Sequence, residues 1–250
     1  MLDFVKESGV TRHFACLTYH GIGNEEDQYT VSEAALRAQS NFLLAQGYTV
    51  EGFEGLHRRL WLPARYVVLT FDDGYTSAML AADCLDEYGF KASFFVTRDR
   101  CLNEPGFIRQ PQIRELRRRG FSLGTHGTTH RKLTRMSEQE CRDELAGSRR
   151  WLEDVLGEPV YFTAVPGGFI NALVMRLAAE EEYLMIGTCS ERMNAVLRNP
   201  FALQTINRVN IRRHFCTASF RSVVEGHSGF YLRRQLRSAA LWLPKQLLPA

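Results

Sequence analysis

Short apolar runs alternate with helix-like segments along most of this chain, and this alternation restricts the fold more than any other feature of the sequence. Runs rich in β-branched and aromatic residues predict strands at 14–19, 66–71, 92–97, 121–125, 161–165, 184–188 and 208–211. Serine caps and glycine stops predict helices between them, at 33–46, 77–88, 113–119, 137–156 and 172–181. Strands that alternate with helices favour a parallel β/α architecture, which we expect to be a barrel. No linker divides the chain, so we expect one domain over residues 1–250.

The bulk composition is that of an ordinary globular protein. Hydrophobic residues make up 45% of the chain, and its 31 basic residues nearly balance 28 acidic ones. The resulting net charge of +3 is too small to indicate a nucleic-acid partner. The N-terminus lacks the apolar segment of a secretory signal, and no apolar run approaches the ~18 residues of a membrane span. Six scattered cysteines without a C-x-x-C pair are typical of free thiols, so we expect a cytoplasmic protein.

Two adjacent carboxylates, Asp72 and Asp73, follow the apolar strand at 66–71 and precede Gly74. Taken alone, this stretch would be read as a turn with a helix cap. Buried charge is costly, however, and it persists where a metal or an opposite charge compensates it. The two carboxylates therefore predict a compensating group elsewhere in the chain.

Polar residues also follow other predicted strands. His20 follows the first strand, His126 and His130 follow the fourth, and the turn at 166–168 follows the fifth. Each of these alone would be typical of a loop or surface residue, but β/α folds place active sites at the carboxyl ends of their strands. Two histidines four residues apart, with a carboxylate from another strand, form a ligand set for zinc or a similar divalent ion. One aspartate would then be a ligand and the other a base acting on water.

Three motifs carry a resemblance to a known family. They are TFDDG at 70–74, HGTTH at 126–130 and the turn Pro166-Gly167-Gly168. Together they resemble the polysaccharide deacetylase family with the NodB homology domain (carbohydrate esterase family 4), over a core at roughly 14–212. The resemblance implies a single distorted (β/α) barrel of about seven strands.

The resemblance also assigns roles to the residues of these motifs. Asp72 would be the general base, and the metal would be held by Asp73, His126 and His130. Zinc is the metal that this ligand set fits most simply, although cobalt, nickel and manganese also suit it. A backbone N–H in the Pro166-Gly167-Gly168 turn would help to bind the oxyanion formed during the reaction.

The third motif differs from the family pattern at two positions. Ala164 stands where the family often has an arginine that orients the catalytic aspartate. Gly167 stands where the family often has tyrosine. Because the oxyanion contact comes from the main chain, glycine at 167 need not remove it.

The source of the general acid also differs from the family pattern. The late Leu-x-His motif that supplies this group in the family has no clear copy here, and His214 and His227 lie outside such a pattern. The N-terminal LTYHGIG segment, however, resembles the Tyr-His segment that precedes TFDDG in a circularly permuted subgroup, typified by deacetylases of poly-N-acetylglucosamine. We therefore expect His20 to be the general acid, with His214 and His227 as alternatives.

These features predict a metal-dependent hydrolase that removes an N-acetyl group from an amino sugar in a polysaccharide or a lipid-linked glycan. One alternative is a catalytically inactive relative that binds glycans, which Ala164 and the missing late histidine keep open. Another is an amidase or deformylase acting on a small or lipid-linked substrate. An open groove would favour polymers, and a closed cup would favour small molecules.

The C-terminal segment at 226–250 has no acidic residue, and its arginines alternate with leucines and Trp242. A basic amphipathic helix of this kind can lie on an anionic membrane surface. It can equally pack its apolar stripe on the barrel and expose its arginines to solvent. The first alternative predicts peripheral contact with the inner surface of the membrane.

Overall fold

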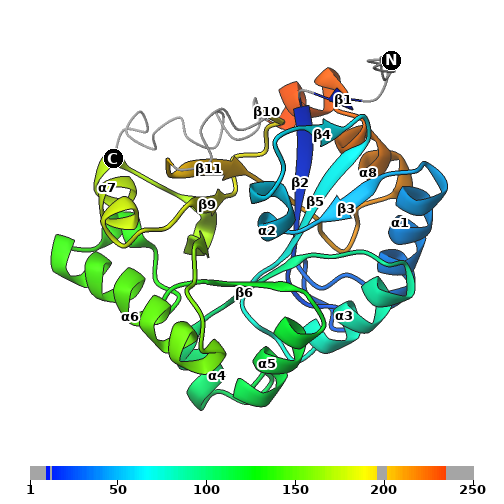
Figure 1. The fold of residues 1–250 in the computed structure, drawn as a ribbon. Coiled ribbons are helices and arrows are strands. Elements are labelled where there is room, and N and C mark those ends of the chain that lie inside the picture. Colours follow the sequence, from blue (N-terminus) through cyan, green and yellow to red (C-terminus); the bar gives the residue numbers. More distant parts are fainter. Residues whose placement is uncertain (1–9, 12, 196–201, 235–250) are drawn as a thin grey trace, which may run out of the picture.

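A sheet of mainly parallel strands runs through the centre of the protein, and most helices lie on its outside (Figure 1). The computed structural model describes residues 10–11, 13–195 and 202–234. The strands are β1 (Val10–Thr11), β2 (His13–Tyr19), β3 (Thr49–Glu51), β4 (Leu62–Pro63), β5 (Tyr66–Phe71), β6 (Ser93–Val96), β7 (Ser122–Thr125), β8 (Phe162–Ala164), β9 (Met185–Thr188), β10 (Asn194–Ala195), β11 (Gln204–Asn207) and β12 (Val209–Asn210). The helices are α1 (Glu33–Ala45), α2 (Phe53–His57), α3 (Ala78–Glu87), α4 (Arg98–Asn103), α5 (Gln110–Arg118), α6 (Glu138–Leu156), α7 (Ala172–Glu180) and α8 (Thr217–Val224), with the 3-10 turns η1 (Leu133–Arg135) and η2 (Pro166–Gly168).

The main sheet is a nearly closed barrel. Its strands are hydrogen-bonded in the order β10-β2-β5-β6-β7-β8-β9-β11, and the neighbours from β2 to β11 are parallel. Only Arg208 separates β11 from β12, yet β11 pairs with β9 and β12 pairs with β2, at the other end of the row. This broken strand joins the two ends and gives the barrel seven strand positions, counted as β2, β5, β6, β7, β8, β9 and the β11–β12 segment. The predicted barrel fold is confirmed.

The predicted helices form where the sequence places caps and stops. The side chain of Ser32 accepts a hydrogen bond from the backbone of Ala35 and starts α1. Ser137 and Glu140 form a reciprocal capping box at the start of α6, and Gly157 ends that helix with a φ of 72°. Local signals of this kind fix the helix ends to within a few residues of the predicted bounds.

Several parts of the prediction differ from the structure, and the short strands β1, β3, β4 and β10 are among the elements not expected. α2 and α4 were not expected, because helices of five and six residues are too short to show a helical period. α5 begins at Gln110 rather than at 113, with Pro111 in its first turn. The strand expected at 208–211 is instead the second half of the broken β11–β12 segment.

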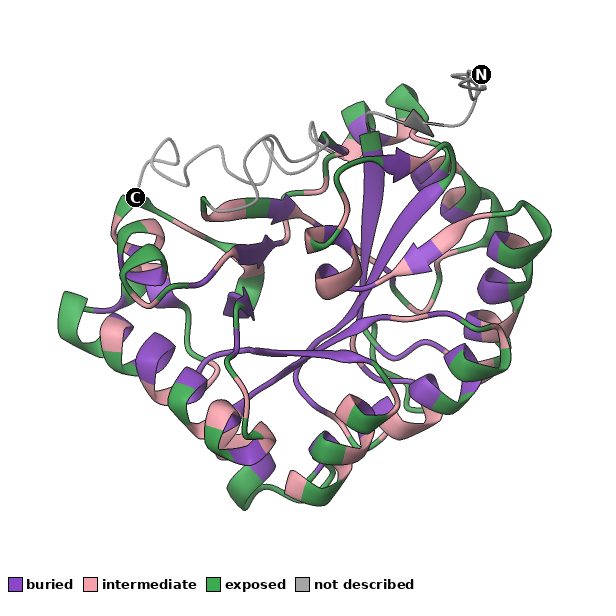
Figure 2. Cartoon of the chain, viewed as in Figure 1, coloured by how far each residue is buried: buried purple, intermediate pink, exposed green. Residues whose placement is uncertain are grey.

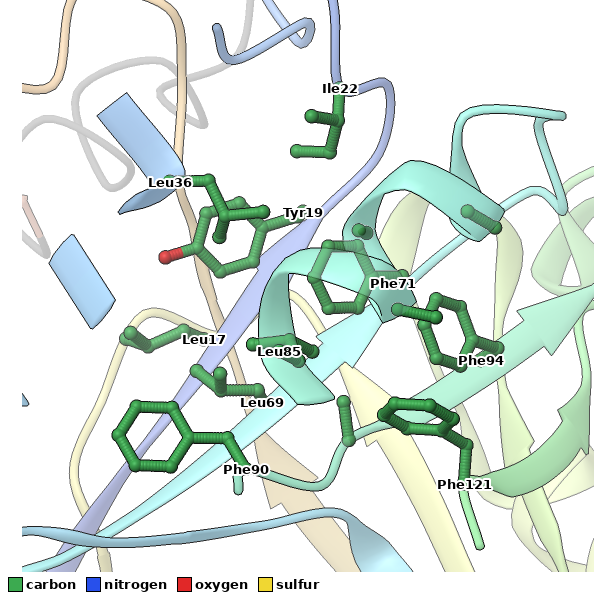
Figure 3. Packing of buried hydrophobic residues seen from close by; sticks show 14 of the residues in the cluster. Leu17, Tyr19, Ile22, Leu36, Leu69, Phe71, Leu85, Phe90, Phe94 and Phe121 are labelled. Carbon is green, nitrogen blue, oxygen red and sulfur yellow. The ribbon is translucent and has the colours of Figure 1, made fainter. Parts of the chain in front are cut away.

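Alternate residues of the strands enter two different cores. On the helix-facing side, a row of aromatic rings crosses neighbouring strands: Tyr19 stacks on Phe71 with centroids 5.1 Å apart, and Phe71 stacks on Phe94 at 4.9 Å. Phe121 then meets Phe94 edge to face at 5.3 Å. Figure 3 shows the first three rings side by side, with Leu85 of α3 close to them. This packing fixes the register of β2, β5 and β6 just before the residues of the site.

The other faces of the strands fill the inside of the barrel. Every residue of β5 is buried, as are most strand residues in Figure 2. Val68, Phe95 and Phe162 belong to the inner cluster, and Phe53 of α2 packs its ring edge to face against Phe95 and Phe162. The interior is therefore packed with side chains, and the strand ends are left to carry the chemistry.

The start of the C-terminal segment packs on the protein. Residues 228–234 are helical, Tyr231 is 5% exposed, and Arg234 pairs with Glu191 at 2.6 Å. The rest of the predicted amphipathic segment, 235–250, lies outside the described residues.

Within the described ranges, no helix has the length and apolar character needed to cross a membrane. The six cysteines are all free, as predicted.

Candidate active site

The carboxyl ends of the parallel strands bring the predicted metal ligands together. Asp73 follows β5, and His126 and His130 lie in the loop after β7. The Nε2 atom of His130 lies 2.8 Å from Oδ1 of Asp73, and Nε2 of His126 lies 3.6 Å from the same oxygen. One ligand atom from each of the three residues falls within 4.8 Å of the others, which is close enough for a single ion.

Two observations show that these residues fit a cation. The Oδ1 atom of Asp73 is buried and lacks a well-aligned hydrogen bond among the described residues, although Nε2 of His130 and Nη1 of Arg100 lie 2.8 and 3.1 Å from it, so a charged acceptor stands where the histidine nitrogens converge. Asp73 and His130 also have positive φ values of 74° and 63°, which are uncommon for residues other than glycine. Backbone strain of this kind concentrates at functional sites, where it aims side chains.

His126 is held in the tautomer that a metal ligand needs. Its Nδ1 atom lies 2.7 Å from the carbonyl oxygen of Ala164. Because a carbonyl only accepts, Nδ1 carries the proton and Nε2 keeps its lone pair. Burial lowers the pKa of His126 to about 4, against the opposing charges of Asp72 and Asp73, so the ring is neutral at pH 7.

The loop that carries the two histidines is supported by a buried carboxylate from α6. Oε2 of Glu144 accepts hydrogen bonds from the backbone N–H of Thr128 at 2.7 Å and of Thr129 at 3.0 Å. The hydroxyl of Thr129 donates to the other oxygen of the same carboxylate. Gly127 lets this carboxylate approach, because a Cβ at 127 would lie 2.9 Å from Oε2. Glu144 was not predicted, because its only signal in the sequence is an acidic residue on the buried face of a long helix.

Asp72 has a different partner. Its two carboxylate oxygens accept from Nη1 and Nη2 of Arg208 at 2.7 and 2.8 Å, a bidentate pair that is almost completely buried. Arg208 also donates from Nε to the carbonyl of Thr188. Burial alone would raise the pKa of Asp72, but Arg208 and His126 outweigh it and hold that pKa below its usual range.

Arg208 supplies the guanidinium that the family often has at position 164, where this chain has alanine. The arginine that the family often has at that position is absent, and the carbonyl of Ala164 instead orients His126. A guanidinium nevertheless reaches Asp72, from the break between β11 and β12 on the far side of the barrel. Arg208 was predicted to start a strand and was given no role in the site. An arginine directly before the buried Val209 and two residues after the buried Ile206 was the available signal.

His20 directly follows β2 and is near enough to Asp72 and Asp73 to contribute to the lowering of both carboxyl pKa values. Its ring lies 5.0 Å from that of Tyr29, and its Nδ1 atom is buried without a hydrogen-bond partner in the described part of the chain. The two other candidates for the general acid, His214 and His227, lie away from the site. His214 is exposed, and His227 contacts Glu225 at 3.1 Å, beside a cavity that includes the start of β5 and so lies at the opposite end of the barrel.

The Pro166-Gly167-Gly168 turn lies against the histidine loop. Both glycines have a φ of 74°, and a Cβ on Gly168 would overlap the backbone nitrogen of Cys189. Pro166 is within 3.6 Å of the position that a Cβ at 127 would take. The turn is therefore packed between the histidine loop and the end of β9, beside the site.

Arg100 of α4 is a further charged group at the site. Its Nη1 atom lies 3.1 Å from Oδ1 of Asp73, and its guanidinium covers the ring of Phe107 at 5.3 Å. Phe107 in turn stacks on Tyr75 at 4.9 Å. The sequence shows no motif between 98 and 110, so this wall of the site could not be predicted.

The class of protein follows from the fold, the site and three comparisons. Residues 62–186, half of the chain, match the family model described as polysaccharide deacetylase. The chain therefore belongs to the polysaccharide deacetylase family, and the predicted resemblance is confirmed.

Individual relatives agree with this assignment. The chain is 25% identical to YxkH of Bacillus subtilis over 160 residues, which are 64% of this chain and 56% of that protein. It is 32% identical to the peptidoglycan-N-acetylglucosamine deacetylase PgdA of Listeria monocytogenes over 113 residues, 43% of this chain and 22% of PgdA. The chain thus spans little more than half of one curated relative and about a fifth of the other. The deacetylase PplD of Streptococcus pyogenes, solved with acetate, is 22% identical and shares the fold with a TM-score of 0.77, over 86% of this chain and 99% of that one.

Proposed function

We propose that this protein is a metal-dependent hydrolase that removes an N-acetyl group from an amino sugar in a polysaccharide or lipid-linked glycan. The observation that carries the proposal is the different partnering of two adjacent buried carboxylates. Asp73 faces two histidine nitrogens, whereas Asp72 is held by Arg208. One carboxylate is thereby suited to a metal and the other to proton transfer.

Asp73, His126 and His130 would hold the ion, and zinc fits this ligand set most simply, with cobalt, nickel and manganese as other candidates. When bound, a divalent ion supplies Lewis-acid activation of water and of the amide carbonyl. The tautomer of His126, fixed by the carbonyl of Ala164, leaves its Nε2 ready to coordinate.

The remaining residues of the site perform the proton transfers. Asp72 is ionised at neutral pH and takes a proton from the attacking water, and the bidentate contact with Arg208 fixes the direction in which its oxygens point. His20 donates a proton to the leaving amine nitrogen. The main-chain N–H of Gly167 binds the oxyanion of the tetrahedral intermediate, a donor worth about 3 kcal/mol, because the N–H of Gly168 already donates to the carbonyl of Val165.

The alternative of an inactive glycan-binding relative loses its main support. That reading rested on Ala164, which removes the arginine that orients the base, and on the missing late histidine. Arg208 replaces the missing guanidinium through two hydrogen bonds to Asp72. A binding module has no use for an oriented, buried carboxylate beside a metal site.

The test is acetate release from N-acetylglucosamine oligomers and from membrane-lipid glycan extracts. Wild-type protein is compared with metal-stripped protein, with Asp72→Asn and with Asp154→Asn, an exposed control on α6. We expect release to require the metal and to fall by about 10²- to 10⁴-fold in Asp72→Asn, while metal content is retained and the control is unaffected. Metal-loaded wild type that releases nothing from any of these substrates would refute the proposal. Release from the lipid extract alone would indicate the lipid-linked substrate.

A further inference from the structure

A groove of about 440 Å³ opens beside the Pro166-Gly167-Gly168 turn, and the candidate active site does not account for it. It is lined by Lys132, Thr134, Arg135, Phe169, Ile170 and Asn171, and we refer to it as the cationic groove. Its lining includes two basic side chains and no acidic one. A hollow with this lining favours a negatively charged ligand.

The cationic groove is lined by two segments that directly follow parts of the candidate active site. Lys132 follows His130, one of the candidate metal ligands, by two residues. Phe169 directly follows Gly168 of the turn. A ligand that extends from the metal site past the turn would therefore enter the groove.

Gly167 leaves space for the basic side chain of the groove. A Cβ at position 167 would lie 3.3 Å from Cε of Lys132 and 3.5 Å from the ring of Phe169. A tyrosine at 167, which the family often has, would project from this point into the side chains of the groove. The glycine instead lets Lys132 lie across the turn, with Nζ 5.4 Å from the centroid of Phe169.

The two cations of the groove have no anionic partner in the part of the chain that the structure describes, and the ring of Phe169 is the neighbour of Lys132. Among the described residues, no ion pair involves Lys132 or Arg135, although most arginines nearby are paired. The adjacent Arg131, for example, pairs with Glu140 at 3.3 Å. Phe169 is 48% exposed, so it presents a flat apolar face to one side of a sugar ring. The groove thus combines an aromatic platform with unpaired positive charge.

We propose that the cationic groove binds a negatively charged sugar unit next to the N-acetylated one, with its ring on Phe169 and its carboxylate or phosphate paired with Lys132 and Arg135. This inference rests on the proposed deacetylase function and narrows its substrate to anionic glycans. A uniformly neutral polymer would leave both cations unpaired.

The test compares matched neutral and anionic substrates. Chitotetraose is paired with a hyaluronan tetrasaccharide, in which N-acetylglucosamine alternates with glucuronate, and N-acetylglucosamine is paired with its 1-phosphate. We expect wild type to favour the anionic member in kcat/KM for at least one pair. The double variant Lys132→Gln/Arg135→Gln should reduce that preference about tenfold, mainly through KM, because two partly exposed ion pairs are lost. Arg131→Gln, which removes a neighbouring charge outside the groove, should retain it.

The two substrate pairs identify the source of the charge, since a carboxylate site favours the hyaluronan arm and a phosphate site favours the sugar phosphate. A preference that survives in the double variant, or a wild type that favours the neutral substrates, overturns the inference. Binding is measured separately with metal-loaded Asp72→Asn. If wild type releases no acetate but the anionic ligand binds about tenfold more weakly when the groove cations are removed, the subsite stands and the proposed reaction fails. If neither turnover nor binding depends on the groove, the subsite fails alone.

Discussion

Replacing Arg208 by glutamine tests whether the orientation of Asp72 and the closure of the barrel depend on one buried ion pair. Glutamine keeps much of the length of arginine but removes the charge and one of the two hydrogen bonds to the carboxylate. The side chains of Arg208 and Asp72 are 0% and 2% exposed, so water cannot replace the lost contacts. The variant therefore leaves a buried carboxylate without its counter-charge.

The expected cost follows from this burial. Breaking a fully buried pair by removing one partner destabilises a protein by about 3–5 kcal/mol. A domain of this size has only about 5–15 kcal/mol of stability in total. We expect Arg208→Gln to lose about 3 kcal/mol or more in guanidinium chloride unfolding at pH 7, measured on metal-free protein so that metal loss does not contribute.

The pH dependence gives the sign of the effect. In wild type the folded pKa of Asp72 lies below its unfolded value, so its contribution to stability is complete above about pH 4 and is lost as the pH falls through the folded pKa. Without Arg208, burial is the dominant influence and the folded pKa rises above the unfolded one. The ionised carboxylate then opposes folding at neutral pH, and protonation relieves this as the pH falls. The stability difference between wild type and variant should be largest near pH 7 and shrink towards pH 4.

The double variant Asp72→Asn/Arg208→Gln separates this electrostatic cost from simple loss of packing. It places two neutral amides at the same positions and leaves no unpaired charge. We expect it to be about 2 kcal/mol more stable than the less stable single variant. If Arg208→Gln loses less than about 1 kcal/mol, or if the double variant recovers nothing, the reasoning about the buried pair is wrong.

Three other perturbations test the support of the site. Glu144→Gln should weaken divalent-metal binding by about 10- to 100-fold in a chelator competition, because the histidine loop loses a charged acceptor. The control Asp143→Asn changes an exposed residue of α6 and should bind the metal as wild type does. Equal metal affinities of wild type and both variants would contradict the supporting role of Glu144. Gly168→Ala should unfold at lower temperature than wild type, since its Cβ meets a backbone atom and its φ of 74° costs about 1–2 kcal/mol for a residue with a side chain; an unchanged Tm would show that the turn adjusts freely. His20→Gln should slow acetate release by about 10²- to 10⁴-fold with metal content unchanged, whereas His214→Gln should not, and the reverse result would reassign the general acid.

The fold was predictable because its signals are local. Caps, glycine stops and apolar runs define each long helix and each strand of the row from β2 to β9 within a few residues. The broken β11–β12 segment was not predictable, because β11 pairs with β9 and β12 pairs with β2, on opposite sides of the row. No local pattern states which strand a residue will pair with, so the place where the barrel closes is visible only in the folded chain.

The same reasoning explains which site residues were found. Asp72, Asp73 and the two loop histidines follow strands directly, so the rule about strand ends predicts that they meet. Arg208 reaches Asp72 across 136 residues of sequence, and Glu144 acts from the middle of a helix. These supporting residues have no motif of their own, because their requirement is a position in space rather than a spacing along the chain.

The two neighbouring aspartates show why the supporting residues decide the chemistry. Two adjacent aspartates have the same ordinary pKa, and burial alone would raise the pKa of each. For Asp72, the main opposing charge is Arg208, which occupies both oxygens and leaves the group ionised and fixed in direction. For Asp73, the opposing groups are His130 and His126, which hold its pKa well below the usual range and whose Nε2 atoms both lie near Oδ1. A charged, buried oxygen on which histidine nitrogens converge is suited to a metal, whereas a carboxylate held at both oxygens by a guanidinium is suited to an oriented base. Arg208 therefore does more than replace a missing family residue, because it makes two adjacent and otherwise equivalent side chains different.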